Sequence, residues 1–156
     1  RCFLVAQYIN IQASLLRFCS DNAKLMRTLT GKDFESLNLD AFSNEDELPA
    51  GDFIGIEDLA LQSASDSSPL DSMSVAVTIS TVSDVNNMRL TKVVDHIYEC
   101  VRPDKSLTLF DEGTGNRIGE IKCVRMSQIL PVQDGKNGRV FQSVVFQAAA
   151  LDGRTK

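Results

Sequence analysis

The part of the chain that most constrains the fold runs from residue 73 to residue 151, where a helical pattern stands between strand patterns. Residues 73–82 alternate between apolar and polar side chains, which is typical of a half-buried strand. Residues 90–101 carry apolar side chains at helical spacing, and residues 118–150 have the pattern of a long hairpin. A helix between strands that can pair antiparallel predicts an α+β domain.

The side chains of these elements indicate which faces are buried. We expect the strand to have an apolar face against a core (Met73, Val75, Val77 and Ile79) and a solvated face (Ser74, Thr78 and Ser80). The helix should bury one stripe, formed by Leu90, Val93, Val94, Ile97, Tyr98 and Val101. Capping is expected from residues 84–87, and Pro103 should end the helix.

A second long helix is predicted near the N-terminus. Most of its apolar residues recur at spacings of three or four, at Leu4, Tyr8, Ile11, Leu15, Phe18, Met26 and Leu29. Gly31 should follow its last turn, because glycine is common after helix ends. The Ser-Asp-Asn sequence at residues 20–22 favours a cap, so two consecutive helices are the alternative.

The segments between these helices are less regular. Residues 32–51 are acidic and predict an ordered loop with room for one short helix, and residues 53–56 predict a first strand. The serine-rich residues 62–72 predict a flexible exposed connection. The whole pattern predicts one α+β domain over residues 1–156, with a small antiparallel sheet of about four to five strands and two main helices on one face.

The hairpin region contains several turn signals. Residues 107–110 predict a short strand and residues 112–116 a turn. Asp-Gly and Asn-Gly dipeptides at residues 134–138 then predict a reversal that returns residues 140–150 along residues 118–132.

The charge distribution argues against nucleic-acid recognition. The chain has 156 residues and a net charge of −5, and residues 1–78 contain 5 basic and 12 acidic side chains against 11 and 9 in residues 79–156. An acidic surface repels phosphate, whereas nucleic-acid readers usually carry a basic stripe. The longest apolar runs are much shorter than the roughly 20 residues needed to cross a bilayer, so we expect no membrane partner.

No residue set predicts a catalytic, cofactor or metal site. Asp95 and His96 are adjacent on a helix and therefore do not face each other. The glycines at residues 113–119 precede a strand instead of a helix, which does not suit a phosphate loop, and residues 134–139 lack the ligands of a calcium loop. The four cysteines, Cys2, Cys19, Cys100 and Cys123, include no C-x-x-C pair and predict reduced, mostly buried thiols.

The element order, from the leading helix to the final strand at residues 140–150, resembles the tail terminator family of long-tailed bacteriophages. This resemblance implies a structural virion protein, without catalysis or cofactor, that caps the head-proximal end of the tail tube and ends tail elongation. It implies assembly in the host cytoplasm into a hexameric ring that meets the tail tube protein, the neck connector and, in contractile tails, the sheath protein. DNA would pass through the lumen without specific binding.

A closed ring needs two different, complementary patches on each subunit. We therefore expect Glu45, Asp46 and Glu47 to pair across the subunit interface with Arg117, Arg125 and Arg139. The alternative for each residue is a solvated charge without a partner. The alternatives for the whole chain are another phage neck or head-completion protein, a non-viral interaction domain and an enzyme.

Overall fold

The computed structural model describes residues 6–63 and 71–154. Its first element is α1 (Tyr8–Thr30), one uninterrupted helix, so the alternative of two consecutive helices is wrong. Asn22 does not cap a new turn, because its Nδ2 donates to the Phe18 carbonyl at 2.8 Å within the helix. Gly31 ends the helix as predicted, with φ of 76° and its N–H donated to the Arg27 carbonyl. Cys2, Leu4 and most of the predicted connection at 62–72 lie outside the described residues.

Within the described residues the sheet has eight strands, more than the sequence predicts. Six follow one path in the order β1 (Phe34–Asn38), β2 (Asp52–Ser63), β3 (Asp71–Val82), β8 (Arg139–Asp152), β5 (Arg117–Cys123) and β4 (Ser106–Phe110). The short β6 (Gln128–Ile129) and β7 (Gln133–Asp134) also pair with β8. All described pairs are antiparallel except β1 with β2, so the expectation of a purely antiparallel sheet is corrected to a mixed one.

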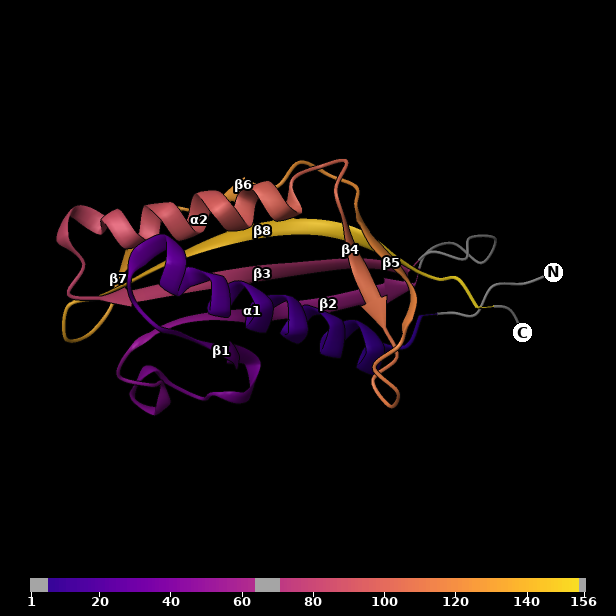
Figure 1. Cartoon of the computed structure of the whole chain (residues 1–156), viewed down its shortest axis with the longest axis horizontal. Coiled ribbons are helices and arrows are strands. Elements are labelled where there is room, and N and C mark those ends of the chain that lie inside the picture. Colours follow the sequence, from indigo (N-terminus) through magenta and orange to yellow (C-terminus); the bar gives the residue numbers. More distant parts are fainter. Residues whose placement is uncertain (1–5, 64–70, 155–156) are drawn as a thin grey trace.

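Both main helices pack on the same face of this sheet, as predicted (Figure 1). α2 (Met88–Val101) follows the short turn η3 (Val85–Asn87) and buries the expected stripe, except that Tyr98 is only partly buried. The Asp84 carboxylate accepts the N–H groups of Arg89 and Leu90, which confirms the predicted capping region. The strands contribute alternate residues to the same core, among them Ile54, Ile56, Val75, Val77, Val144 and Phe146.

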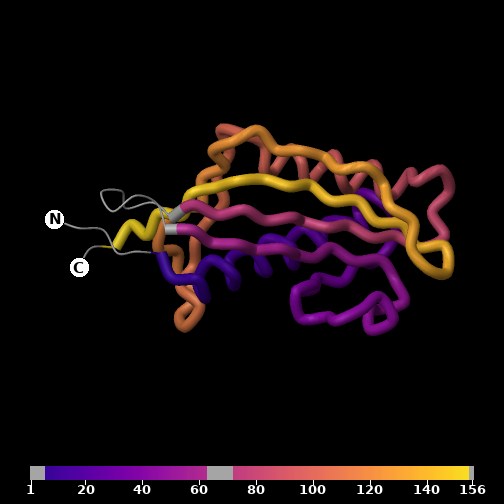
Figure 2. Tube along the Cα trace, turned by 180° about the vertical axis from the view of Figure 1, so that it is seen from behind, coloured from indigo at the N-terminus to yellow at the C-terminus, as the bar shows by residue number. Residues whose placement is uncertain are grey.

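The parallel pair β1 and β2 is joined by residues 39–51, which we call the crossover segment. It contains two short 3-10 turns, η1 (Leu39–Ala41) and η2 (Glu45–Glu47), and β1 precedes it inside the region predicted as a loop. Leu39 lies so close to Gly55 of β2 that a Cβ at Gly55 would come within 2.8 Å of its Cγ. Because Gly55 alternates with the core residues Ile54 and Ile56, this contact lies on the face of the sheet opposite to the helices, which we call the second face. Figure 2 shows the crossover segment beside the β2 edge of the sheet.

The crossover segment changes the environment of the polar face of β3. The sequence predicts solvated side chains there, but Thr78 and Ser80 are 4% and 0% exposed. Ser80 donates to the Val140 carbonyl and accepts from the Arg139 guanidinium, so its hydroxyl is hydrogen-bonded inside the protein. The prediction of a solvated face is therefore wrong at these two residues.

The predicted long hairpin is present but interrupted. β5 stops at Cys123, and residues 124–127 form a bend before β6 continues along β8. Cys123 pairs with Ala148 and Gln128 with Val145, so the four residues 124–127 on one strand lie opposite only two residues, 146 and 147, on the other. Because the surplus is an even number of residues, Ile129 stays on the face of Ile121 and Cys123, opposite the core residue Val144. Ile121 and Cys123 are nevertheless buried, whereas Ile129 is 38% exposed.

A partly buried ion network joins the start of β2, the end of β3 and the start of α2. Arg89 Nε donates to Asp52 Oδ2 at 3.2 Å, and its NH2 donates to the Val82 carbonyl at 2.6 Å. Arg89 NH1 also lies 3.7 Å from Asp84 Oδ1. The side chains of Asp52 and Asp84 are only 4% and 2% exposed, so this arginine supplies the compensating charge of two buried carboxylates.

Candidate assembly surfaces

The second face contains a groove of about 390 Å³ between the crossover segment and β7. Its apolar walls are the half-buried side chains of Leu39, Phe42, Leu48 and Phe141, with Phe53 at its base. Three carboxylates also line it: Glu45 from the crossover segment, Glu57 from β2 and Asp134 from β7. No lysine or arginine stands among the described lining residues, so the groove combines apolar walls with negative charge.

Hydrogen bonds fix the Glu57 carboxylate in the groove. Thr78 Oγ1 donates to Glu57 Oε1 at 2.5 Å, and Ser143 Oγ lies 2.7 Å from Thr78 Oγ1 and 3.5 Å from the same carboxylate oxygen. These contacts join β2, β3 and β8 across the sheet. They hold the carboxylate on a rigid strand framework, which is the kind of element that presents a binding group with little freedom to move.

The predicted acidic residues contact their own chain at the rim of this groove. Glu45 Oε1 accepts the N–H of Lys136 at 2.8 Å, and Asp46 forms an ion pair of 3.0 Å with the Lys136 ammonium. This partner holds the pKa of Lys136 above its ordinary value, chiefly through the hydrogen bond and charge of Asp46. Glu47 accepts from the Ser43 N–H and the Asn44 side chain, which closes the η2 turn.

The three predicted arginines occupy different environments. Arg117 and Arg125 are exposed, as an interface role requires. Arg139 is only 6% exposed, and its guanidinium donates to the Pro49 and Gly51 carbonyls and to Ser80, and lies 5.2 Å from the Phe53 ring centre. The expected surface position of Arg139 is therefore not observed, because it anchors the crossover segment within its own chain. The predicted pairing across subunits stays a prediction for the other residues.

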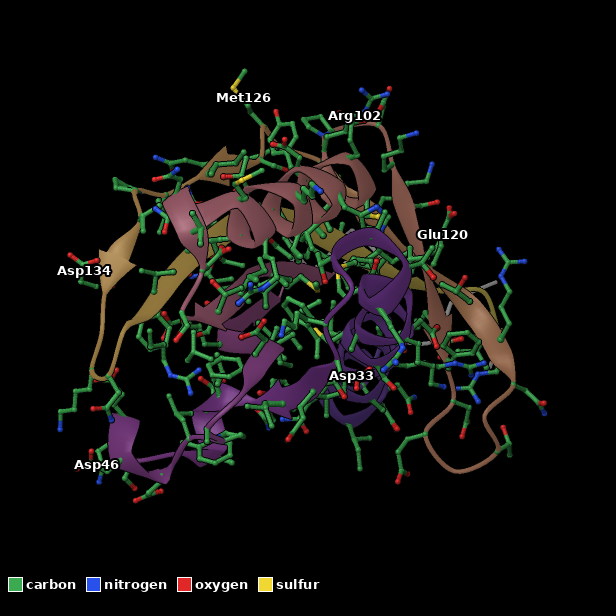
Figure 3. All side chains as sticks on the ribbon, turned by 60° about the vertical axis from the view of Figure 1, so that its left-hand side comes forward. Asp33, Asp46, Arg102, Glu120, Met126 and Asp134 are labelled. Atoms are coloured by element: carbon green, nitrogen blue, oxygen red, sulfur yellow. The ribbon has the colours of Figure 1, made fainter. Side chains whose placement is uncertain are left out.

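An exposed apolar surface lies along the irregular stretch of the hairpin. Met126 is 83% exposed and projects away from the ribbon (Figure 3), and Val124 is 54% exposed. Ile129 and Val132 continue the exposed apolar side chains along the strand. Exposed apolar side chains that gather on a protein surface mark a site that another protein can cover.

The glycine-rich segment and His96, which the sequence analysis rejected as functional sites, both have structural roles. The Asp111 carboxylate accepts the N–H groups of Thr114 and Gly113, so the glycine-rich segment is a turn, as expected. These two bonds and the Arg154 guanidinium hold the pKa of Asp111 below its ordinary value. His96 Nε2 lies 2.7 Å from Asn22 Oδ1 and links α2 to α1.

Two of the predicted buried thiols are observed in the core. Burial raises the pKa of the Cys19 thiol to about 12 and that of Cys123 to about 11. Cys100 is half-buried. Within residues 6–63 and 71–154, no three His, Cys, Asp or Glu side chains group closely enough to hold a metal ion. Among the helices of the same residues, none is both long and apolar enough to cross a membrane.

Sequence reasoning missed the groove and Glu57. Glu57, Thr78 and Ser143 come from three strands, and each resembles an ordinary polar residue of a strand's solvated face when it is taken alone. The available signal was the continued alternation after Phe53, which places Glu57 on the face opposite to Ile54 and Ile56.

Comparisons with known proteins match the fold. No family model and no curated protein matches this sequence. Among solved structures, one chain, named without a statement of function, aligns with a TM-score of 0.59 at 9% identity and covers 96% of this chain and 99% of its own length. Another, from a structure named "Virion of native gene transfer agent (GTA) particle", aligns with a TM-score of 0.55 at 12% identity over 93% of this chain and 99% of that chain. At such identities, the likeness shows that this chain and those two share a fold.

Proposed function

We propose that this protein is a structural component of a phage-like particle and that it forms the ring that closes the head-proximal end of the tail tube. The observation that carries this proposal is the shared fold with a chain of a gene transfer agent virion, which extends over nearly the whole of both chains. The tail-terminator resemblance of the sequence narrows the role within such a particle. No catalytic step is part of the proposed function.

The surface of the protein supports a role in assembly. Exposed apolar side chains at Val124 and Met126 and the negatively charged groove provide two chemically different patches on one chain. A ring closed by rotation needs such a heterologous contact, since each subunit meets its neighbour through a different surface. The tail tube protein would bind one side of this ring, and the neck connector the other.

Particles made without this chain test the role. We expect tails of irregular, excessive length that carry no heads, because nothing ends elongation or offers a docking surface. Particles with an epitope-tagged chain should carry the label at the junction of tail and head in negative-stain images. Tails of normal length in the absence of the chain would contradict the terminator role, and a label at the head shell or neck alone would favour the alternative of a head-completion or neck protein.

A further inference from the structure

We propose that the groove receives the bend at residues 124–127 of a second copy of this chain, with Arg125 opposite the groove carboxylates and Met126 against its aromatic walls. This inference rests on the proposed function, since it names the contact that would hold neighbouring subunits of the ring together. One subunit contributes the groove to this contact, and its neighbour contributes the bend.

The chemistry of the groove suits an arginine and a methionine. Glu45 and Glu57 are half-buried, and a carboxylate shielded from water attracts a cation more strongly than one in bulk solvent. A guanidinium can donate two parallel hydrogen bonds to a carboxylate, which adds direction to that attraction. Phe42 and Phe141 offer aromatic edges and faces, with which a thioether makes favourable contacts.

The bend that carries these two side chains is anchored at both ends. Its first residue, Val124, donates its N–H to the Gln147 carbonyl at 3.0 Å. At its other end the Ser127 hydroxyl, 5% exposed, donates to the Val101 carbonyl at the end of α2 at 2.5 Å. Arg125 and Met126 lie between these anchors and are exposed. A segment whose backbone is already anchored loses little conformational entropy when it binds, so less of the binding free energy is spent on ordering it.

The occupant is a second copy because one chain carries both complementary patches. Met126 projects from the top of the view in Figure 3, whereas Asp46, beside the groove at its crossover rim, and Asp134, on its β7 rim, lie at the left. Arg125 borders a hollow beside Ser74 and Gln147, at another place on the second face. The bend and the groove are therefore separate patches, and one chain can contact a different neighbour through each of them around a ring. The groove volume of about 390 Å³ lies at the lower end of ligand-pocket sizes, which suits two side chains better than a whole element.

Two complementary variants test this contact in the full chain. The bend variant carries Arg125→Glu and Met126→Ala and keeps its groove. The groove variant carries Ser43→Arg and Asp134→Arg, both at exposed lining positions, and keeps its bend. Lys24→Glu is the matched control, because it reverses a positive charge at an exposed position of α1 that belongs to neither patch. Circular dichroism and thermal melting verify that each variant folds.

We expect light scattering after size exclusion to find the wild type and the Lys24→Glu control in the same assembly. Each of the two variants alone should be monomeric, with the apparent Kd raised about thirtyfold or more, the effect typical of a central interface residue. An equimolar mixture should form a one-to-one dimer and stop there, because one functional bend meets one functional groove.

Several results would overturn the inference. One is a bend variant that assembles like the wild type, and another is a loss of assembly in the Lys24→Glu control. A mixture of the two variants that stays monomeric is the third. A wild type that never associates would overturn it as well. The proposed function is tested separately, with the epitope-tagged chain and with the particles made without this chain. If the tag lies at the junction of tail and head but the purified wild type is monomeric, only the proposed contact between subunits is wrong.

Discussion

Replacement of Arg89 by methionine should destabilise the fold far more than loss of a surface arginine. Methionine keeps most of the apolar length of the side chain but removes the charge that faces Asp52 and Asp84. The two carboxylates are 4% and 2% exposed, so water cannot replace the guanidinium. The variant would keep two neighbouring buried negative charges without a compensating cation.

The contacts set the size of the effect. Arg89 makes one hydrogen bond to a carboxylate and one to the Val82 carbonyl, and bonds that involve a charged group contribute about 1.5–3 kcal/mol each. Removing one partner of a buried pair costs roughly 3–5 kcal/mol. Because the Arg89 side chain is 19% exposed and partly screened by solvent, we take the lower end of this range, about 3 kcal/mol.

Urea unfolding followed by circular dichroism measures this loss. With a slope of about 2 kcal/mol per molar urea, the midpoint should fall by roughly 1.5 M. Arg27→Met is the matched control, since the Arg27–Asp33 pair is 70% and 78% exposed, and its midpoint should not move beyond error. Asp52→Asn combined with Arg89→Met should recover part of the loss. Equal midpoints for Arg89→Met and Arg27→Met would refute the reasoning.

Three further variants and conditions test other parts of the fold. The pKa of Asp111 is lowered in the folded state, so its carboxylate stabilises the fold above about pH 4 and loses this effect as the pH falls further. The urea midpoints of the wild type and Asp111→Asn should therefore converge as the pH falls from 7 to 3. A difference between the midpoints that stays constant over this range would contradict this prediction. Cys19 and Cys123, with raised pKa values, should react with a thiol reagent at pH 8 only after denaturation, and mass spectrometry that finds rapid native labelling would show otherwise. Gly119→Ala should cost about 3 kcal/mol by thermal melting, because a Cβ there would overlap the Leu151 carbonyl and push β5 from β8; an unchanged melting temperature would mean that the strands shift freely.

The elements that the sequence predicted well carry one strong periodic signal. α2 has an apolar stripe over three turns, and the apolar residues of β3 alternate without interruption, so the pattern identifies the residues of both elements that form the core. It does not reveal the burial of Thr78 and Ser80 on the other face of β3. β1 has no such signal, because Glu35 and Ser36 are exposed and only Phe34 is buried. Its strand conformation depends on parallel pairing with β2, which no local pattern reveals.

The candidate site was harder to predict for the same physical reason. The acidic residues 45–47 were noticed from their charge, but their position beside Lys136 depends on a crossover that brings residues about 90 apart into contact. Arg139 was expected at the surface because arginines are mostly exposed. Its burial follows from the backbone carbonyls of Pro49 and Gly51, acceptors whose position no sequence pattern indicates.

The length of β8 has a mechanical consequence for this domain. Twelve consecutive residues of β3 pair with it in one unbroken register, from Asp71 opposite Ala150 to Val82 opposite Arg139. A pull along the strand axis would load all of these ladder bonds together in shear, whereas a pull at right angles would open them one after another. The domain should therefore resist extension most strongly along β8 and separate most easily when it is pulled across this strand.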